Sequence, residues 1–118
     1  SKPGAPLNGN WKLTELSLVK TNFEELFPSQ KPSIVFEEDS QKVHGHTGCN
    51  RFCGKVTTNG SQLGITETIS MTKEACQGKG EELYLKALKA ADNFKITEQN
   101  QLKLFNKETL LLVFEQRP

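Results

Sequence analysis

The chain has 118 residues, a length that accommodates one domain with a modest hydrophobic core. Fifteen basic and fourteen acidic residues give a net charge of +1, which argues against a global attraction to nucleic acid or to anionic membranes. With 35% hydrophobic residues and no run of about 20 apolar residues, the composition is that of an ordinary soluble protein and excludes a membrane-spanning helix.

The first eight residues are polar on the whole and contain prolines and a glycine. We therefore expect residues 1–8 to form a flexible tether and residues 9–118 to form a single domain. Such a start also fits a mature N-terminus from which a signal peptide has been removed.

The first half of the chain predicts short strands. Apolar residues alternate over 11–18 with one slip of the two-residue period, which is typical of a β-bulge. Residues 21–27 could form one helical turn, but the two prolines that follow favour an irregular connection. The runs 33–38 and 42–46 are joined by a polar turn, so they predict a hairpin.

The middle of the chain predicts a second hairpin and a helix. Segments 56–58 and 62–66 flank the dipeptide Asn59-Gly60, which favours a two-residue turn because both residues tolerate positive φ. Residues 69–72 are a short strand candidate. A helix is predicted over 81–91, where the apolar residues form one stripe and two glutamates occupy the first turn.

Three further strands are predicted over 93–97, 101–105 and 110–114. Their connections are short enough for hairpins, so these strands are expected to be antiparallel neighbours. The last strand is apolar at every position, a pattern typical of a central strand covered on both faces. The sequence thus predicts many short antiparallel strands interrupted once by a helix.

The stretch 45–54 is unusually rich in special residues: it holds three of the nine glycines, two of the three cysteines and one of the two histidines. Clustered glycines indicate a sharp bend or a close approach to another backbone. Asn50 is a residue that can stabilise such a bend by hydrogen-bonding its own neighbours. We therefore expect the stretch to be a structural corner of the fold.

Two chemical interpretations of the same stretch stay open beside the structural one. His44, His46, Cys49 and Cys53 could bind zinc or sense redox state, because two histidines share a face of a strand and sulfur ligands follow. Alternatively, both histidines are simply solvent-exposed. Catalysis is not indicated, since the cysteine spacing is not that of a thioredoxin-like pair and no hydrolase signature is present. We expect no catalytic residue, no bound metal and no cofactor.

Two motifs resemble a known family. Gly45-x-x-Gly48-Cys49-Asn50-Arg51-Phe52-x-Gly54, followed by Ser70-Met71-Thr72-Lys73-x-Ala75-Cys76, is similar to the META domain of the HslJ type. The resemblance extends over about 7–115. It implies an α+β domain with an antiparallel, curved or barrel-like sheet and one packed helix at about 81–91. It assigns structural motif roles to Gly45, Gly48, Asn50, Phe52, Gly54 and Thr72.

The resemblance also carries functional expectations. Family members are mostly small bacterial envelope proteins, often lipoproteins, with inferred roles in envelope stress or drug tolerance. It implies a non-enzymatic domain of the periplasm or outer membrane that binds a protein or lipid partner and no nucleic acid. Membrane attachment would come only through an N-terminal lipid anchor outside this chain. A monomer is expected, with a dimer linked through Cys53 as a further possibility, and a purely structural interaction module remains an alternative.

The resemblance pairs the two motif cysteines, Cys49 and Cys76, as a disulfide in an oxidising compartment, which leaves Cys53 over. A Cys53–Cys76 bridge stays open as the rival pairing, because Cys49 and Cys53 would share a face in an unbroken strand. His44, His46 and Cys53 are not part of the family pattern.

Overall fold

The computed structural model describes residues 7–17, 23–28, 30–37, 39–65, 69–76 and 79–116. These residues form nine strands and two helices, in the order β1 (Gly9–Leu16), α1 (Phe23–Leu26), β2 (Ser33–Glu37), β3 (Lys42–His46), β4 (Arg51–Asn59), β5 (Gln62–Ile65), β6 (Ser70–Met71), α2 (Gly80–Ala90), β7 (Asn93–Ile96), β8 (Gln101–Asn106) and β9 (Thr109–Gln116).

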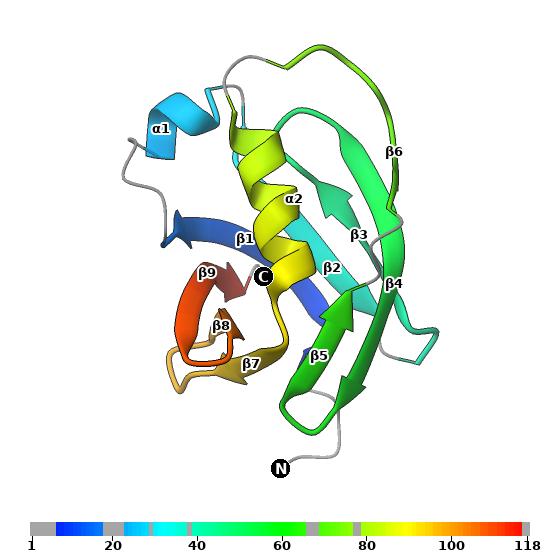
Figure 1. Cartoon of the computed structure of the whole chain (residues 1–118), viewed down its shortest axis with the longest axis vertical. Coiled ribbons are helices and arrows are strands. Elements are labelled where there is room, and N and C mark those ends of the chain that lie inside the picture. Colours follow the sequence, from blue (N-terminus) through cyan, green and yellow to red (C-terminus); the bar gives the residue numbers. More distant parts are fainter. Residues whose placement is uncertain are drawn as a thin grey trace.

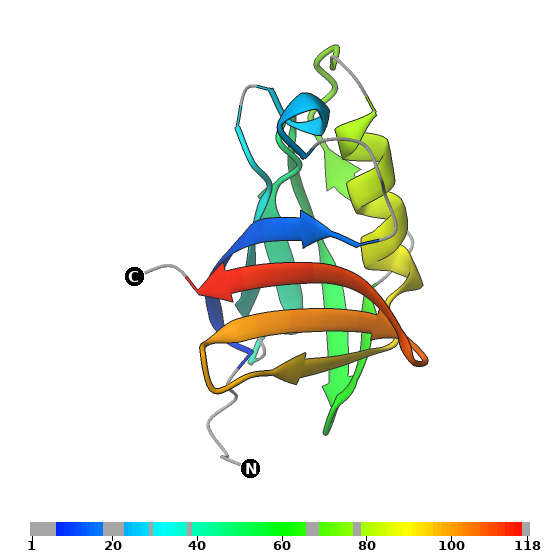
Figure 2. The same cartoon turned by 90° about the vertical axis from the view of Figure 1, so that its left-hand side faces the viewer.

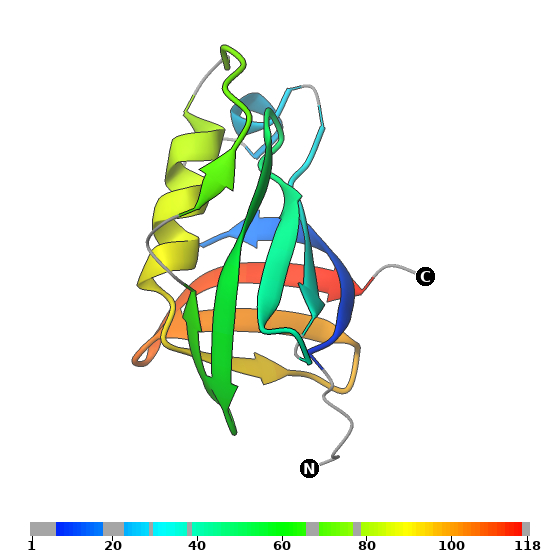
Figure 3. The same cartoon turned by 90° about the vertical axis from the view of Figure 1, so that its right-hand side faces the viewer.

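Eight of the strands close into an antiparallel barrel. Their order is β3–β2–β1–β9–β8–β7–β5–β4, and β4 pairs back with β3. Strand β6 pairs with β4 on a separate stretch from β5. Figures 2 and 3 show β1, β9, β8 and β7 as one wall, crossed at a steep angle by the strands of the opposite wall. The sheet is therefore antiparallel and barrel-like, in a fold that is mostly β.

Helix α2 covers one side of the barrel, where it contacts β5, β8 and β9 (Figure 1). Its Tyr84 is fully buried and makes edge-to-face contacts with Phe52 of β4 and Phe114 of β9, with ring centroids 6.2 and 6.3 Å apart. One aromatic side chain thus ties the helix to both walls. Burial raises the pKa of Tyr84, whose hydroxyl has no hydrogen-bond partner among the described residues.

The strand patterns predict the observed elements well. The register between β1 and β9 shifts between Leu13 and Glu15, which is the expected bulge. In β9 the consecutive residues 111–114 are all buried, as expected for a central strand, which here lies between β1 and β8. No helix in the described ranges is long and apolar enough to span a bilayer.

Three expectations were wrong in detail. Residues 23–26 form the one-turn helix α1, so the described part of the chain contains two short helices, not one. Asn59 pairs with Gln62, so the hairpin loop is Gly60-Ser61; glycine at the first loop position supplies the positive φ of 64° that this turn needs.

The third concerns Leu7, placed in the tether by its polar neighbours. It is fully buried, and its carbonyl accepts a hydrogen bond from the Trp11 indole at 3.0 Å. The rest of the expected tether over 1–6, and parts of the segments 11–18, 21–27, 33–38 and 62–66, lie outside the described residues.

Candidate functional site

A tight turn over residues 47–50 joins β3 to β4. The Thr47 backbone N–H donates to the Asn50 carbonyl at 2.8 Å, and the Asn50 N–H donates to the Thr47 hydroxyl at 2.9 Å. Gly48 has a φ of +95°, and a Cβ there would lie 2.8 Å from the Phe27 ring. Both observations require glycine, so the sharp bend expected for this stretch is present.

Asn50 is the centre of this turn and is only 2% exposed. Its side-chain oxygen accepts hydrogen bonds from the Thr72 hydroxyl at 2.8 Å and from the Glu74 backbone N–H at 2.7 Å. Its amide nitrogen donates to Glu81 Oε1 at 2.9 Å. One buried amide thus joins the start of β4, the segment 72–76 and the first turn of α2.

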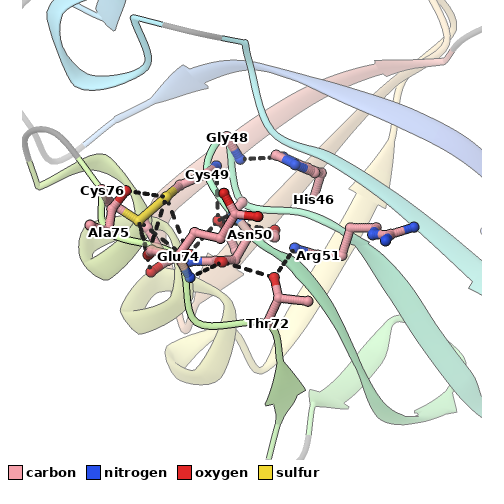
Figure 4. Close-up of a disulfide and its surroundings, with 11 residues drawn as sticks. His46, Gly48, Cys49, Asn50, Arg51, Thr72, Glu74, Ala75 and Cys76 are labelled. Carbon is pink, nitrogen blue, oxygen red and sulfur yellow. Dashed lines mark hydrogen bonds between the residues drawn. A yellow bond between two sulfur atoms is a disulfide. The ribbon is translucent and has the colours of Figure 1, made fainter.

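A disulfide joins Cys49 to Cys76 beside this amide, with Cα atoms 5.8 Å apart (Figure 4). This is the first of the two pairings considered from the sequence. The rival Cys53–Cys76 pairing does not form, because β4 begins at Arg51 and Cys49 therefore lies in the turn, not on the same strand as Cys53. Cys53 is a free, exposed thiol. We call residues 47–50, 72–76 and Glu81 the disulfide corner.

Glu81 has a defined orientation in the disulfide corner. Thr47, which is fully buried, donates its hydroxyl to Glu81 Oε1 at 2.6 Å, and Asn50 donates to the same oxygen. The second carboxylate oxygen, Oε2, lies 3.4 Å from Cys76 Sγ. Two donors therefore hold one oxygen and leave the other directed at the sulfur atoms.

The disulfide corner forms one wall of a cavity of about 390 Å³, which we call the disulfide pocket. The end of α1 and the residues after it supply a second part of the lining. Apolar Leu26, Phe27 and Pro28 thus join polar groups of the corner in a mixed lining. It is lined by Leu26, Phe27, Pro28, Gln30, His46, Thr47, Gly48, Cys49, Glu74, Ala75, Cys76 and Glu81.

The structure does not bring together His44, His46, Cys49 and Cys53, the four residues of the alternative zinc or redox interpretation. His44 and Cys53 are opposite one another on β3 and β4 and are exposed, and His44 Nε2 lies 3.2 Å from Glu37 Oε2. His46 Nδ1 instead accepts the Gly48 N–H at 2.9 Å (Figure 4). The sulfur of Cys49 is bonded to Cys76, so this ligand set is wrong.

The remaining motif residues have structural positions. Phe52 is buried against Tyr84, and Gly54 lies opposite Val43 in β3. Gly45 lies opposite Phe52, and a Cβ at Gly45 would collide with the Ser33 carbonyl oxygen of β2. The Thr72 hydroxyl accepts a hydrogen bond from the Arg51 N–H at 3.1 Å, so Thr72 joins the segment 72–76 to β4.

Sequence reasoning missed two residues of the site, Thr47 and Glu81. Thr47 stands inside the motif stretch, and a threonine three residues before a buried asparagine is a signal for a side-chain-stabilised turn. Glu81 was interpreted only as a favourable charge at a helix start. Its partners lie 31 and 34 residues away, so no local pattern identifies its role.

A second cavity, of about 530 Å³, lies where β5 meets β7. The described residues of these strands share one register pair, Gln62 with Asn93, and two flanking backbone hydrogen bonds, from Leu63 N–H to the Asp92 carbonyl and from Phe94 N–H to the Ser61 carbonyl. We call this joint the β5–β7 seam. Its cavity is lined by Thr57, Thr58, Asn59, Gln62, Leu63, Gly64, Asp92 and Asn93.

The sequence model of the META domain family matches residues 5–118 of the chain. The chain belongs to the META domain family. In this META domain the two motifs that carried the resemblance meet at the disulfide corner, where Asn50 is central and Cys49 and Cys76 are joined.

Solved structures share the fold of this META domain. A protein from Burkholderia xenovorans, determined by NMR, is 21% identical with a TM-score of 0.71, and the match covers 98% of this chain and 88% of that one. A DUF4847 family protein from Bacteroides vulgatus, determined by crystallography, is 14% identical with a TM-score of 0.69, covering 96% and 95%. These similarities establish the fold alone. The comparison with curated proteins finds no match.

Proposed function

We propose that this META domain is a non-enzymatic binding domain of the cell envelope, in the periplasm or at the outer membrane, and that it holds a protein partner in the disulfide pocket. The single observation that carries this proposal is the Cys49–Cys76 disulfide at the wall of a cavity of about 390 Å³. Structural disulfides persist in oxidising compartments and are rare in the cytosol.

The lining of the pocket favours a polypeptide over a lipid chain as the occupant. Leu26 and Phe27 contribute apolar surface to the lining, whereas Glu74 and Glu81 contribute carboxylates. Glu81 Oε1 already accepts hydrogen bonds from Thr47 and Asn50, but a lipid chain would offer no donor to Glu81 Oε2 or to the Glu74 carboxylate, which costs free energy. A peptide segment can place an apolar side chain against Phe27 and a cation or N–H donor against the carboxylates.

The sulfur chemistry supports a binding role over catalysis. Cys49 and Cys76 are bonded to each other, so neither offers the thiolate that a nucleophilic mechanism needs. Cys53 keeps a free thiol but lies on an exposed strand position that does not line the disulfide pocket. The pocket residues thus supply hydrogen bonds and charge, which suits recognition.

Site-specific photocrosslinking in cells that produce the protein naturally tests the binding site. A photoreactive amino acid at Ala75, an exposed residue of the pocket rim, should give one discrete protein adduct. The matched position is Thr109, which is exposed and does not line the pocket, and it should give none. No adduct from Ala75 would favour a purely structural module, and a lipid adduct would replace the protein partner with a lipid.

Cysteine mapping of the protein isolated from the same cells tests the compartment. Alkylation without reductant should modify Cys53 and leave Cys49 and Cys76 joined in one peptide pair. Modification of all three cysteines would contradict an envelope location. This experiment does not depend on the capture of a partner, so the proposed envelope location and the proposed binding role are tested separately.

A further inference from the structure

We propose that the disulfide corner is a zinc site in its reduced form, with Cys49, Cys76 and Glu81 as the three protein ligands. Their potential ligand atoms, two sulfurs and one carboxylate oxygen, all lie within 4.8 Å of one another. The three residues are half-buried and come from three separate segments. This ligand set differs from the one that the sequence suggested, and it goes beyond the binding role proposed above.

The geometry of the oxidised corner is close to what zinc requires. Tetrahedral zinc with its usual bond lengths places a sulfur and an oxygen ligand about 3.6 Å apart. Cys76 Sγ and Glu81 Oε2 are already 3.4 Å apart. The two sulfurs need to separate to about 3.8 Å. Rotation of the side chains can achieve this, because the Cα atoms, 5.8 Å apart, need not move.

The groups around the three ligands are arranged as a supporting shell. Thr47 and Asn50 donate to Glu81 Oε1, so Oε2 is the oxygen left to bind the metal. The Asn50 amide nitrogen also lies 3.3 Å from the Glu74 carbonyl oxygen, 3.4 Å from Cys76 Sγ and 3.5 Å from Cys49 Sγ, so a thiolate at either cysteine can compete with that carbonyl for the second N–H. Amide N–H donors directed at sulfur stabilise thiolate ligands, and buried outer partners fix ligand orientation.

The chemistry balances with a dithiol as reductant. One thiolate of the reductant attacks a sulfur of the bridge, and its second thiol then displaces the mixed disulfide. The reductant leaves as its own disulfide, and Cys49 and Cys76 each gain one electron and one proton. Zinc binding next releases both thiol protons. The fourth ligand is water, which the adjoining disulfide pocket can supply.

The test uses the full chain with Cys53→Ser, which removes the third thiol, so that only Cys49 and Cys76 can supply sulfur ligands. Titration with zinc, and with cobalt(II) as a spectroscopic probe, is carried out before and after reduction. We expect the reduced protein to bind one equivalent of metal and to show a thiolate-to-cobalt absorption band, and the oxidised protein to show neither. An absent band after reduction would overturn the proposal.

Two matched substitutions distinguish a zinc site that includes Glu81 from non-specific metal binding by two thiols. Glu81→Gln should weaken zinc binding at least tenfold, since it removes a ligand charge from the site. Glu74→Gln makes the same chemical change in the same pocket and should leave the affinity within about twofold, because the Glu74 carboxylate is not in the cluster. Equal losses, or no loss from Glu81→Gln, would overturn the assignment.

Reduction of the disulfide could unfold the chain, and circular dichroism detects whether it does. In that case zinc must restore the native spectrum and raise the melting temperature of the reduced protein, because it binds only the folded corner. Binding without any recovery of structure would show that the two thiols act as an unfolded chelator, which contradicts the proposal.

Discussion

The disulfide corner and the β5–β7 seam both join segments that are distant in the sequence, but with different interactions. The corner uses a covalent bond, a buried amide and a buried hydroxyl. The seam uses one register pair and backbone hydrogen bonds beside an exposed hairpin. The difference teaches that the polar groups facing a pocket are held in place at the corner, whereas the seam only closes the barrel.

Removal of the disulfide should have the largest effect. Cys76→Ser in the Cys53→Ser background opens a loop whose ends are 27 residues apart, which should lower the free energy of unfolding by about 3.5 kcal/mol and the melting temperature by about 10–20 °C. Cys53→Ser alone should change stability by less than about 0.5 kcal/mol, since Cys53 is exposed. Urea denaturation measures both values, and equal stabilities would show that the bridge does not brace the corner.

Loss of the buried amide should be the next largest effect. Asn50→Ala leaves the Glu74 N–H without its acceptor and removes one of the two donors to Glu81 Oε1, so we expect a loss of about 2–3 kcal/mol with the disulfide intact. Asn59→Ala, at the exposed end of β4 near the seam, should cost less than about 0.5 kcal/mol. Similar losses of unfolding free energy for the two variants in urea denaturation would show that the disulfide corner is no more strongly braced than the β5–β7 seam.

Two glycines extend the comparison to the backbone. A Cβ at Gly45 meets the Ser33 carbonyl oxygen, which cannot move away within the β2–β3 pair, so Gly45→Ala should cost about 1–2 kcal/mol. A Cβ at Gly64, at the seam, would lie 3.3 Å from the Thr57 hydroxyl, a side chain that can rotate. Gly64→Ala should therefore be close to neutral. Thermal denaturation measures the stability of both variants. A larger loss for Gly64→Ala than for Gly45→Ala would contradict the expected backbone collision at Gly45.

Asp92 should give the smallest effect and a pH dependence. The Lys107 backbone N–H and the Asn93 amide hold the pKa of Asp92 below its ordinary value of 3.8. Because the pKa of Asp92 is lower in the folded protein than in the unfolded chain, the ionised carboxylate stabilises the folded state fully at any pH above the unfolded-state pKa. This stabilisation is lost as the pH falls through the folded-state pKa. Asp92→Asn should therefore reduce the drop in urea midpoint between about pH 5 and pH 2. An unchanged drop would show that Asp92 makes no such contribution.

Local patterns in the sequence predict most of the fold and only part of the site. Hairpins and the bulge of β1 follow from periodicity, which each strand carries in its own residues. Helix α1 was one of two interpretations of residues 21–27 and was not favoured, because two prolines follow and four residues are too few to show a helical period. The shift of the β4–β5 turn by one residue depends on strand register, which the dipeptide Asn59-Gly60 does not fix.

The candidate site divides in the same way. The motif stretch shows where the chain bends, and the family resemblance pairs Cys49 with Cys76. The orientation of Glu81 depends on Thr47 and Asn50, which approach it only after the barrel has formed and α2 has docked. A single sequence holds no signal of that approach, so the corner was recognised as structure while its carboxylate was not recognised as part of a site.

Native-state hydrogen exchange tests the central contrast most directly, because it measures the opening free energy of individual amides. In the oxidised protein, the N–H groups of Asn50 and Glu74 at the corner should exchange with a higher opening free energy than those of Leu63 and Phe94 at the seam. Corner amides that open as easily as the seam amides, or more easily, would contradict the account of the disulfide corner as the braced site of the molecule.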